Sequence, residues 1–286
     1  MLQEDIMFWN LLRMESDKVF RRRLLWIGLV IAILPMVIAF FAFFHLSQSA
    51  SLAKYWIWPG GLTSALAFAD GFSPGYGYSA YLLAVVVGVV TAQEYSWRTM
   101  QLWLSHGIPR PLLLLAKFML SLVTVLLVVL AFLLVGGVTS MIFAYQLHGS
   151  IDSSHFDIVQ LFLSYLRTCY GILPYVGLTF LLVVVSRSAA VALTGTILFM
   201  LAVELPITAL IIPLLGANYA GIAQYLPAGL AQGMNDQNYS AAHLTTTTFI
   251  SAGHPSPTIA AICIAVYTLV LFGISLWVFQ RQNLTN

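Results

Sequence analysis

The residue types that carry out catalysis are few in this sequence, and they do not fall into a known catalytic spacing. A nucleotide-binding P-loop has the pattern G-x-x-x-x-G-K-[ST], yet none of the three lysines, Lys18, Lys54 and Lys117, is followed by serine or threonine. No H-E-x-x-H, C-x-x-C or G-x-S-x-G pattern occurs either. The sequence therefore predicts no catalytic residue, no metal ligand and no cofactor in this chain, which we do not expect to be an enzyme.

Two charged residues, Arg167 and Glu204, lie deep inside long apolar stretches. At 1.5 Å per residue, both lie about 14 Å from the expected outer ends of these stretches. A charge at that depth in a bilayer costs at least about 3 kcal/mol, and pairing with an opposite charge is the usual compensation. We therefore predict an Arg167–Glu204 pair, which either clamps two helices together or lines a path. Pro174 and Pro206 predict kinks nearby.

The amino-acid composition indicates that these charged residues lie in a membrane domain and not in a soluble one. Hydrophobic residues make up 60% of the chain and charged residues 8%, whereas a soluble domain has about 25% charged residues. The 12 lysines and arginines are too few and too scattered for a nucleic-acid surface. Residues 1–286 are therefore interpreted as a single membrane domain in contact with the lipid bilayer.

Six apolar stretches are long enough to cross a hydrocarbon core of about 30 Å as helices. The predicted fold class is thus an all-α polytopic membrane protein with six transmembrane helices. The stretches are 24–46, 77–95, 111–145, 158–185, 189–215 and 258–279. The third is too long for one perpendicular span, so it must tilt, project from the membrane or break near Gly136 and Gly137. We expect it to project on the outer side.

The positions of lysine and arginine set the predicted orientation, because cytoplasmic flanks retain positive charge. Six spans with the N- and C-termini in the cytoplasm place all but two of these residues in or beside the cytoplasm, the exceptions being Lys54 and Arg167. A cleavable signal peptide is disfavoured, because more than twenty residues with four acids precede the first apolar stretch. Residues 1–23 are predicted to form a helix along the cytoplasmic interface.

The connection over residues 216–257 is the longest predicted outer loop. Its first part, residues 218–230, is apolar but too short to cross the membrane. This length favours a re-entrant or interfacial hairpin before the last span. The remainder is polar and is predicted to be a solvated loop.

The segment Glu94–Arg110, between the second and third spans, has the most distinctive local pattern. Met100, Trp103 and Leu104 are apolar, and the pattern ends at Gly107 and Pro109, which stop helices. It predicts a short helix lying across the cytoplasmic surface, where it can present a face to a partner. The alternative is a connecting loop whose aromatic residues belong to the interfacial belt.

The segment resembles the same region in permease subunits of ABC transporters of the type-2 exporter class. In that family an acidic residue closes the second span and a surface helix leads into the third. The positions that carry the resemblance are Glu94, Arg98-Thr99, Leu104-Ser105, Pro109-Arg110 and Lys117. The interfacial N-terminal helix, the six spans and the hairpin before the last span also resemble the family, so the resemblance extends along the whole chain.

The resemblance implies a function that the residues alone do not specify. Glu94–Arg110 would be a coupling helix that docks on a separate ABC ATPase subunit. The coupling positions would be Glu94, Arg98, Met100, Trp103, Leu104 and Arg110. The working unit would hold two ATPase copies, which bind ATP and Mg, and a second permease that is the same or a homologous chain. Such assemblies are expected in the cytoplasmic membrane of prokaryotes.

Two other function classes stay open from the residues alone. One is a membrane anchor or immunity-type protein without transport, and the other is an ion-coupled secondary transporter or channel. Dependence on a partner ATPase discriminates between them and the exporter permease. The pattern specifies neither the substrate nor whether the permease pair is homomeric.

Overall fold

The computed structural model describes residues 21, 23–48, 109–148, 158–204, 206–207, 221, 224–231, 233–234 and 255–282. Across this part of the chain the regular elements are helices, without a strand. They are α2 (Arg23–Gln48), α5 (Arg110–His148), α6 (Ile158–Ser186), α7 (Ala189–Leu198), the π-helix η2 (Phe199–Glu204) and α11 (Pro257–Arg281). The predicted second span and the N-terminal interfacial helix lie outside the described residues.

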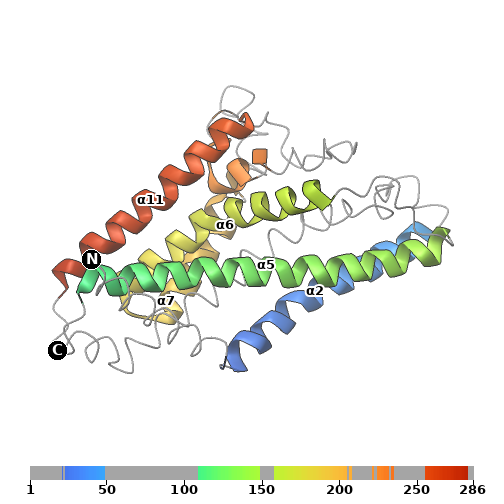
Figure 1. Ribbon diagram of the computed structural model, residues 1–286, viewed down its shortest axis with the longest axis horizontal. Helices are drawn as coiled ribbons and strands as arrows, with labels where there is room; N and C mark the ends of the chain where they lie inside the picture. The colour runs from blue at the N-terminus through green and yellow to red at the C-terminus, as the bar shows by residue number, and fades with distance from the viewer. Residues whose placement is uncertain are drawn as a thin grey trace.

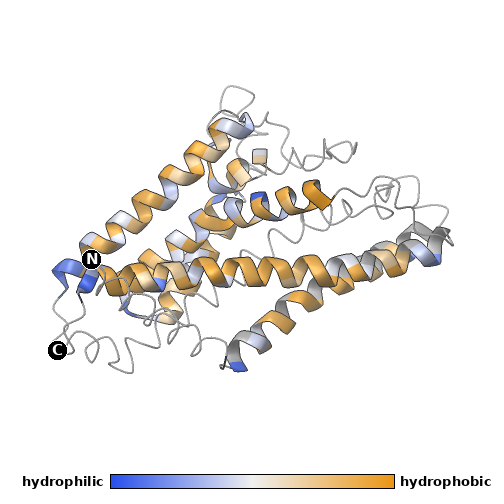
Figure 2. Cartoon of the chain, in the orientation of Figure 1, coloured by the Kyte–Doolittle hydropathy of each residue, from blue (hydrophilic) through white to orange (hydrophobic). Residues whose placement is uncertain are grey.

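Three of the described helices are long and apolar enough to cross a membrane, judged by length and composition. They run over Arg110–Phe143, Leu161–Ser186 and Pro257–Arg281. Figure 2 shows that most residues of these helices are hydrophobic, with hydrophilic residues between them. The helices α2, α5, α6 and α11 coincide with four of the six predicted apolar stretches, and each end differs by at most three residues.

Helix α5 is continuous over 39 residues, so the break considered at Gly136 and Gly137 does not occur. Both glycines are buried within the helix. At 1.5 Å per residue, α5 is about 58 Å long, roughly twice the hydrocarbon thickness. A helix of this length must tilt or project, as expected from the length of the apolar stretch.

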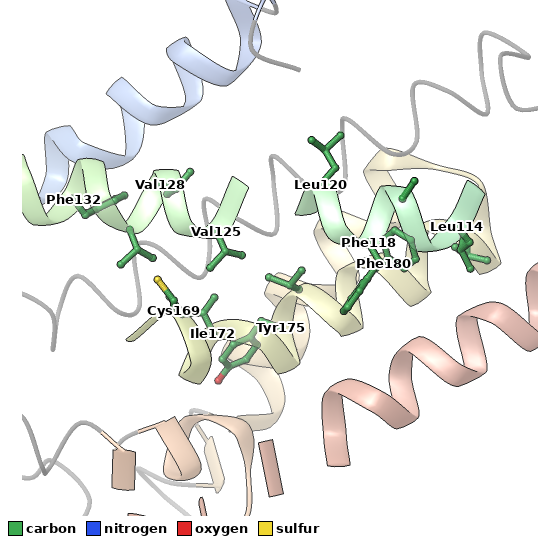
Figure 3. Packing of buried hydrophobic residues seen from close by; sticks show 14 of the residues in the cluster. Leu114, Phe118, Leu120, Val125, Val128, Phe132, Cys169, Ile172, Tyr175 and Phe180 are labelled. Atoms are coloured by element: carbon green, nitrogen blue, oxygen red, sulfur yellow. The ribbon is translucent and has the colours of Figure 1, made fainter. Parts of the chain in front are cut away.

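Helix α6 lies at the centre of the described bundle and packs against α5, α7 and α11. Its interface with α5 forms the main hydrophobic core, in which Ile172 and Phe180 face Val125 and Phe118 (Figure 3). Pro174 lies inside α6 and deprives the helix of one backbone hydrogen bond. Figure 1 shows α6 changing direction along its length.

Three helix ends meet where α5 begins, which we call the Arg110 end of the bundle. Helix α11 ends there, since Arg110 binds the carbonyl groups of Gln280 and Gln282. Helix α6 ends there too, because the side chain of Gln282 reaches the carbonyl of Val184. Thus α5 runs opposite to α6 and α11, and the hydrophilic ends of α5 and α11 gather at this end (Figure 2).

Helix α2 runs in the same direction as α5. Phe44, near the end of α2, stacks on Phe143, near the end of α5, with 4.8 Å between ring centroids. Figure 1 shows these two ends together at the side of the bundle remote from the Arg110 end. Helices α2 and α5 therefore run in one direction, and α6 and α11 run in the other.

Candidate functional site

The buried carboxylate of Glu204 is the centre of the candidate site. Glu204 is the last residue of η2 and is only 4% exposed. Two residues later, Pro206 has no N–H to donate, and its ring collides with the carbonyl four residues earlier in an α-helix. A wider π-turn is a known response to such a mismatch. The kink expected at Pro206 thus takes the form of a π-helix that carries Glu204.

Each carboxylate oxygen of Glu204 accepts a hydrogen bond from a different part of the chain. The hydroxyl of Tyr175 on α6 donates to Oε2 at 2.6 Å. The backbone N–H of Ala228 donates to Oε1 at 3.0 Å. The hydroxyl of Tyr175 points away from α5 in Figure 3, which agrees with a partner on the opposite side of α6. The carboxylate therefore joins η2, α6 and the segment that contains Ala228.

Ala228 belongs to a short helix whose first turn needs an acceptor. Leu230 donates to the carbonyl of Leu226 at 2.9 Å, so Leu226 is the N-cap and Pro227 the first helical residue, a position that favours proline. The N–H of Ala228 then has no acceptor within its own helix. Glu204 supplies one from another helix, as an N-cap side chain does locally, and its negative charge suits the positive end of the helix dipole.

Residues 224–231 and 233–234, which we call the wedge, pack against the first half of α11. Leu230 is fully buried with Ala260 and Ile264. The hydroxyl of Tyr267 donates to the carbonyl of Tyr225 at 3.2 Å. A re-entrant or interfacial hairpin was predicted for residues 218–230. The described residues 224–230 pack against α11, and the hairpin itself stays a prediction.

A second buried polar contact joins α6 to α7 near the same site. The hydroxyls of Thr179 and Thr196 lie 3.0 Å apart, and neither side chain is exposed. The Thr179 hydroxyl also contacts the carbonyl of Tyr175 at 2.8 Å. The α6–α7 interface therefore has a polar seam that begins at Glu204 and Tyr175 and continues toward the Arg110 end.

The predicted partner of Glu204 was Arg167, and this pair stays a prediction. The contacts described for Glu204 are those to Tyr175 and Ala228. Arg167 is partly buried on α6, eight residues before Tyr175, a distance of about 12 Å along an α-helix. Sequence reasoning missed both Tyr175 and Ala228. The Leu226-Pro227 start of a helix inside an apolar segment was the available signal that an acceptor must lie nearby.

Arg110 is the one predicted coupling residue that the structure describes. Its Nη1 donates to the carbonyl of Gln280 at 2.9 Å and to that of Gln282 at 3.1 Å. The last carbonyls of a helix have no partner within it, and a cation there also suits the helix dipole. Arg110 thus closes the end of α11. The other predicted coupling residues lie outside the described residues: Glu94, Arg98, Met100, Trp103 and Leu104.

The arrangement defines a class: a protein whose described part is built from helices that are compatible with a membrane, with a buried carboxylate that joins several of them. Within the described residues, no group of three His, Cys, Asp or Glu residues is placed to hold a metal ion. The chain belongs to the family described as protein of unknown function (DUF2705), whose profile matches residues 25–285. A search among curated proteins finds no match to the chain.

Proposed function

We propose that this chain is the transmembrane permease subunit of an ATP-driven ABC exporter. It would cross the cytoplasmic membrane six times with both termini inside, and the Arg110 end would face the cytoplasm. A separate ATPase subunit would bind Mg and ATP, because the sequence has no P-loop of its own. The helix directions described above support the six-span arrangement, because the first and third predicted spans run one way and the fourth and sixth run the other way.

The observation that carries the proposal is the attachment of Arg110. This residue ends the predicted coupling segment Glu94–Arg110 and begins α5, and it also holds the last carbonyls of α11. The side chain of Gln282 in turn donates to Val184, near the end of α6, at 2.6 Å. A displacement of the segment would therefore act on three helices together.

This attachment supports a simple coupling mechanism. Closure of an ATPase dimer around ATP would press on Glu94–Arg110, and the linked ends of α5, α6 and α11 would move with it. ATP binding would then shift the equilibrium between two arrangements of the helices to the extent that it favours one of them. Export of the substrate between the two permease copies would follow from that shift.

The test is to reconstitute the chain with the ATPase encoded next to it, and to measure co-purification and ATPase activity. Glu94→Ala and the double variant Met100→Ala/Trp103→Ala remove the face that is predicted to dock. We expect both to weaken the complex and to reduce membrane-coupled ATP hydrolysis. Trp58→Ala lies between the first two predicted spans, 24–46 and 77–95, and so on the predicted outer side; it is the matched control and should leave both unchanged. An intact complex with normal activity in the two test variants would refute the docking role of this segment.

A further inference from the structure

We propose that the wedge closes the outer side of the bundle and that the Glu204 carboxylate is the latch that holds it in place. The inference extends the proposed function by assigning an outer gate, and its orientation rests on the proposed six-span arrangement. The latch itself rests on the contacts of Glu204 with Tyr175 and Ala228.

The position of the wedge follows from the geometry of α5 and α11. These helices are joined at the Arg110 end and diverge toward their other ends (Figure 1). The wedge lies in the part where they are apart, against Ala260 and Ile264, which belong to the first two turns of α11. Its inner face is apolar and completely covered, because Leu230 is 0% and Ala231 1% exposed. If the wedge left this place, Ala260 and Ile264 on α11 would lose the side chain of Leu230 that packs against them.

The carboxylate is suited to act as a latch because it links two bodies through separate oxygens. Oε2 is bound to α6 through Tyr175 and Oε1 to the wedge through Ala228. Away from water such bonds are strong, and a buried carboxylate that loses a donor is costly. A shift of α6 relative to η2 therefore disturbs the same group that holds the wedge. Docked and released states of the wedge are favoured over intermediate positions.

The chain offers a route by which the inner end can reach the latch. The end of α6 is bonded to Gln282, which lies beside the carbonyl groups that Arg110 holds. Tyr175 is on the same helix, about three turns before this end. It also follows Pro174 directly, so it lies at the point where the helix bends most easily. Motion of the inner half of α6 would thus move the donor to Oε2.

The test is chemical labelling of a buried position in the wedge, in the full chain in membrane vesicles. The two natural cysteines are replaced by Cys169→Ala and Cys263→Ala, and Ala231→Cys places a small reporter thiol at a covered position. A membrane-impermeant maleimide is then added to the outer side. The rate of labelling reports how often the wedge leaves its place.

Glu204→Gln and Tyr175→Phe each weaken the latch without removing the bulk of a side chain. We expect Tyr175→Phe to raise the labelling rate about tenfold or more, because it loses a hydrogen bond to a charged group. Glu204→Gln keeps an acceptor for Ala228 and loses only the charge, so we expect a smaller increase in the labelling rate. Tyr170→Phe is the matched control, because its hydroxyl donates from α6 to the carbonyl of Ala261 at 2.7 Å without contact to the carboxylate. It should label at the rate of the parent.

The outcomes separate the two proposals. Equal rates in all variants would overturn the latch, and so would a similar increase in Tyr170→Phe, which would indicate general loosening. Tyr175→Phe alone decides the matter if Glu204→Gln does not fold. Faster labelling confined to the inner side would support the latch and contradict the orientation in the proposed function. If the latch behaves as expected but the chain binds no ATPase, the latch stands and the proposed exporter function fails.

Discussion

The contact between Arg110 and the end of α11 gives a prediction whose size can be worked out from the structure. Arg110→Ala removes two charge-assisted hydrogen bonds, of 2.9 and 3.1 Å, one exposed and one partly buried. Such bonds contribute about 1.5–3 kcal/mol each when shielded, and much less when exposed to water. We therefore expect the variant to lower the free energy of unfolding by about 2 kcal/mol, including the lost interaction with the helix dipole.

The assay is an SDS titration of the purified chain in mixed micelles, with two comparison variants. Arg110→Lys keeps the charge but not the planar group, so we expect about half the loss. Arg281→Ala removes the neighbouring arginine, whose guanidinium lies 4.2 Å from the ring centroid of Trp277. That contact is exposed and is worth about 0.5–1 kcal/mol. Arg281→Ala is therefore the control for the loss of one positive charge at this end.

Two results would contradict this reasoning. If Arg110→Ala costs no more than Arg281→Ala, the carbonyl contacts do not hold the end of α11. If Arg110→Ala leaves the free energy of unfolding unchanged and abolishes binding of the ATPase, Arg110 acts by touching the partner and not by joining helices. Destabilisation together with reduced coupling is the result that the structure predicts.

Further predictions concern close packing and the polar seam. An added Cβ at Gly233 would lie 2.9 Å from the backbone oxygen of Pro255, whereas one at Gly273 would meet nothing within 4 Å. Gly233→Ala should therefore lower the free energy of unfolding by about 1–3 kcal/mol, and Gly273→Ala should be neutral or stabilising by up to about 1 kcal/mol; the same titration measures both. A double-mutant cycle with Thr179→Val and Thr196→Val should give a coupling energy of about 0.6 kcal/mol, as is typical between membrane helices, and additive effects would mean that the 3.0 Å contact adds nothing.

The extents of the long helices were predictable, because the physical requirement is local. A run of apolar residues that ends in charged or helix-breaking residues determines where a membrane helix starts and stops. Helix α6 was predicted over 158–185 and spans Ile158–Ser186. The end of α5 was the least accurate, since the predicted stretch ended at 145 and the helix continues to His148. Polar residues in the last turn of a projecting helix carry no hydrophobic signal.

The partners of Glu204 were not predictable in the same way. Counting residues from the ends of two stretches treats both as straight α-helices, and it paired Glu204 with Arg167 by depth alone. The structure has a proline inside α6 and a π-helix that ends at Glu204, so neither segment is a straight α-helix of the kind that this count assumes. The Arg167–Glu204 pair stays a prediction. Tyr175 lies 29 residues and Ala228 24 residues from Glu204 in the sequence. Such pairings depend on how helices pack, which a single sequence does not specify.

The attachment of α6 along its length favours the clamp among the two roles predicted for Glu204, and this role stays a prediction. Side chains along α6 bond to several other elements: Tyr165 to α5, Tyr170 to α11, Tyr175 to η2 and Thr179 to α7. Pro174 separates the first two from the last two. The half of α6 before Pro174 is thus bonded to α5 and α11, while the half after it is bonded to α7 and η2 and also packs through Phe180 against both α5 and α11. A bend at Pro174 would shift Tyr175 relative to Glu204, and we expect the buried carboxylate, which is 4% exposed, to transmit that shift to the wedge through its bond to Ala228.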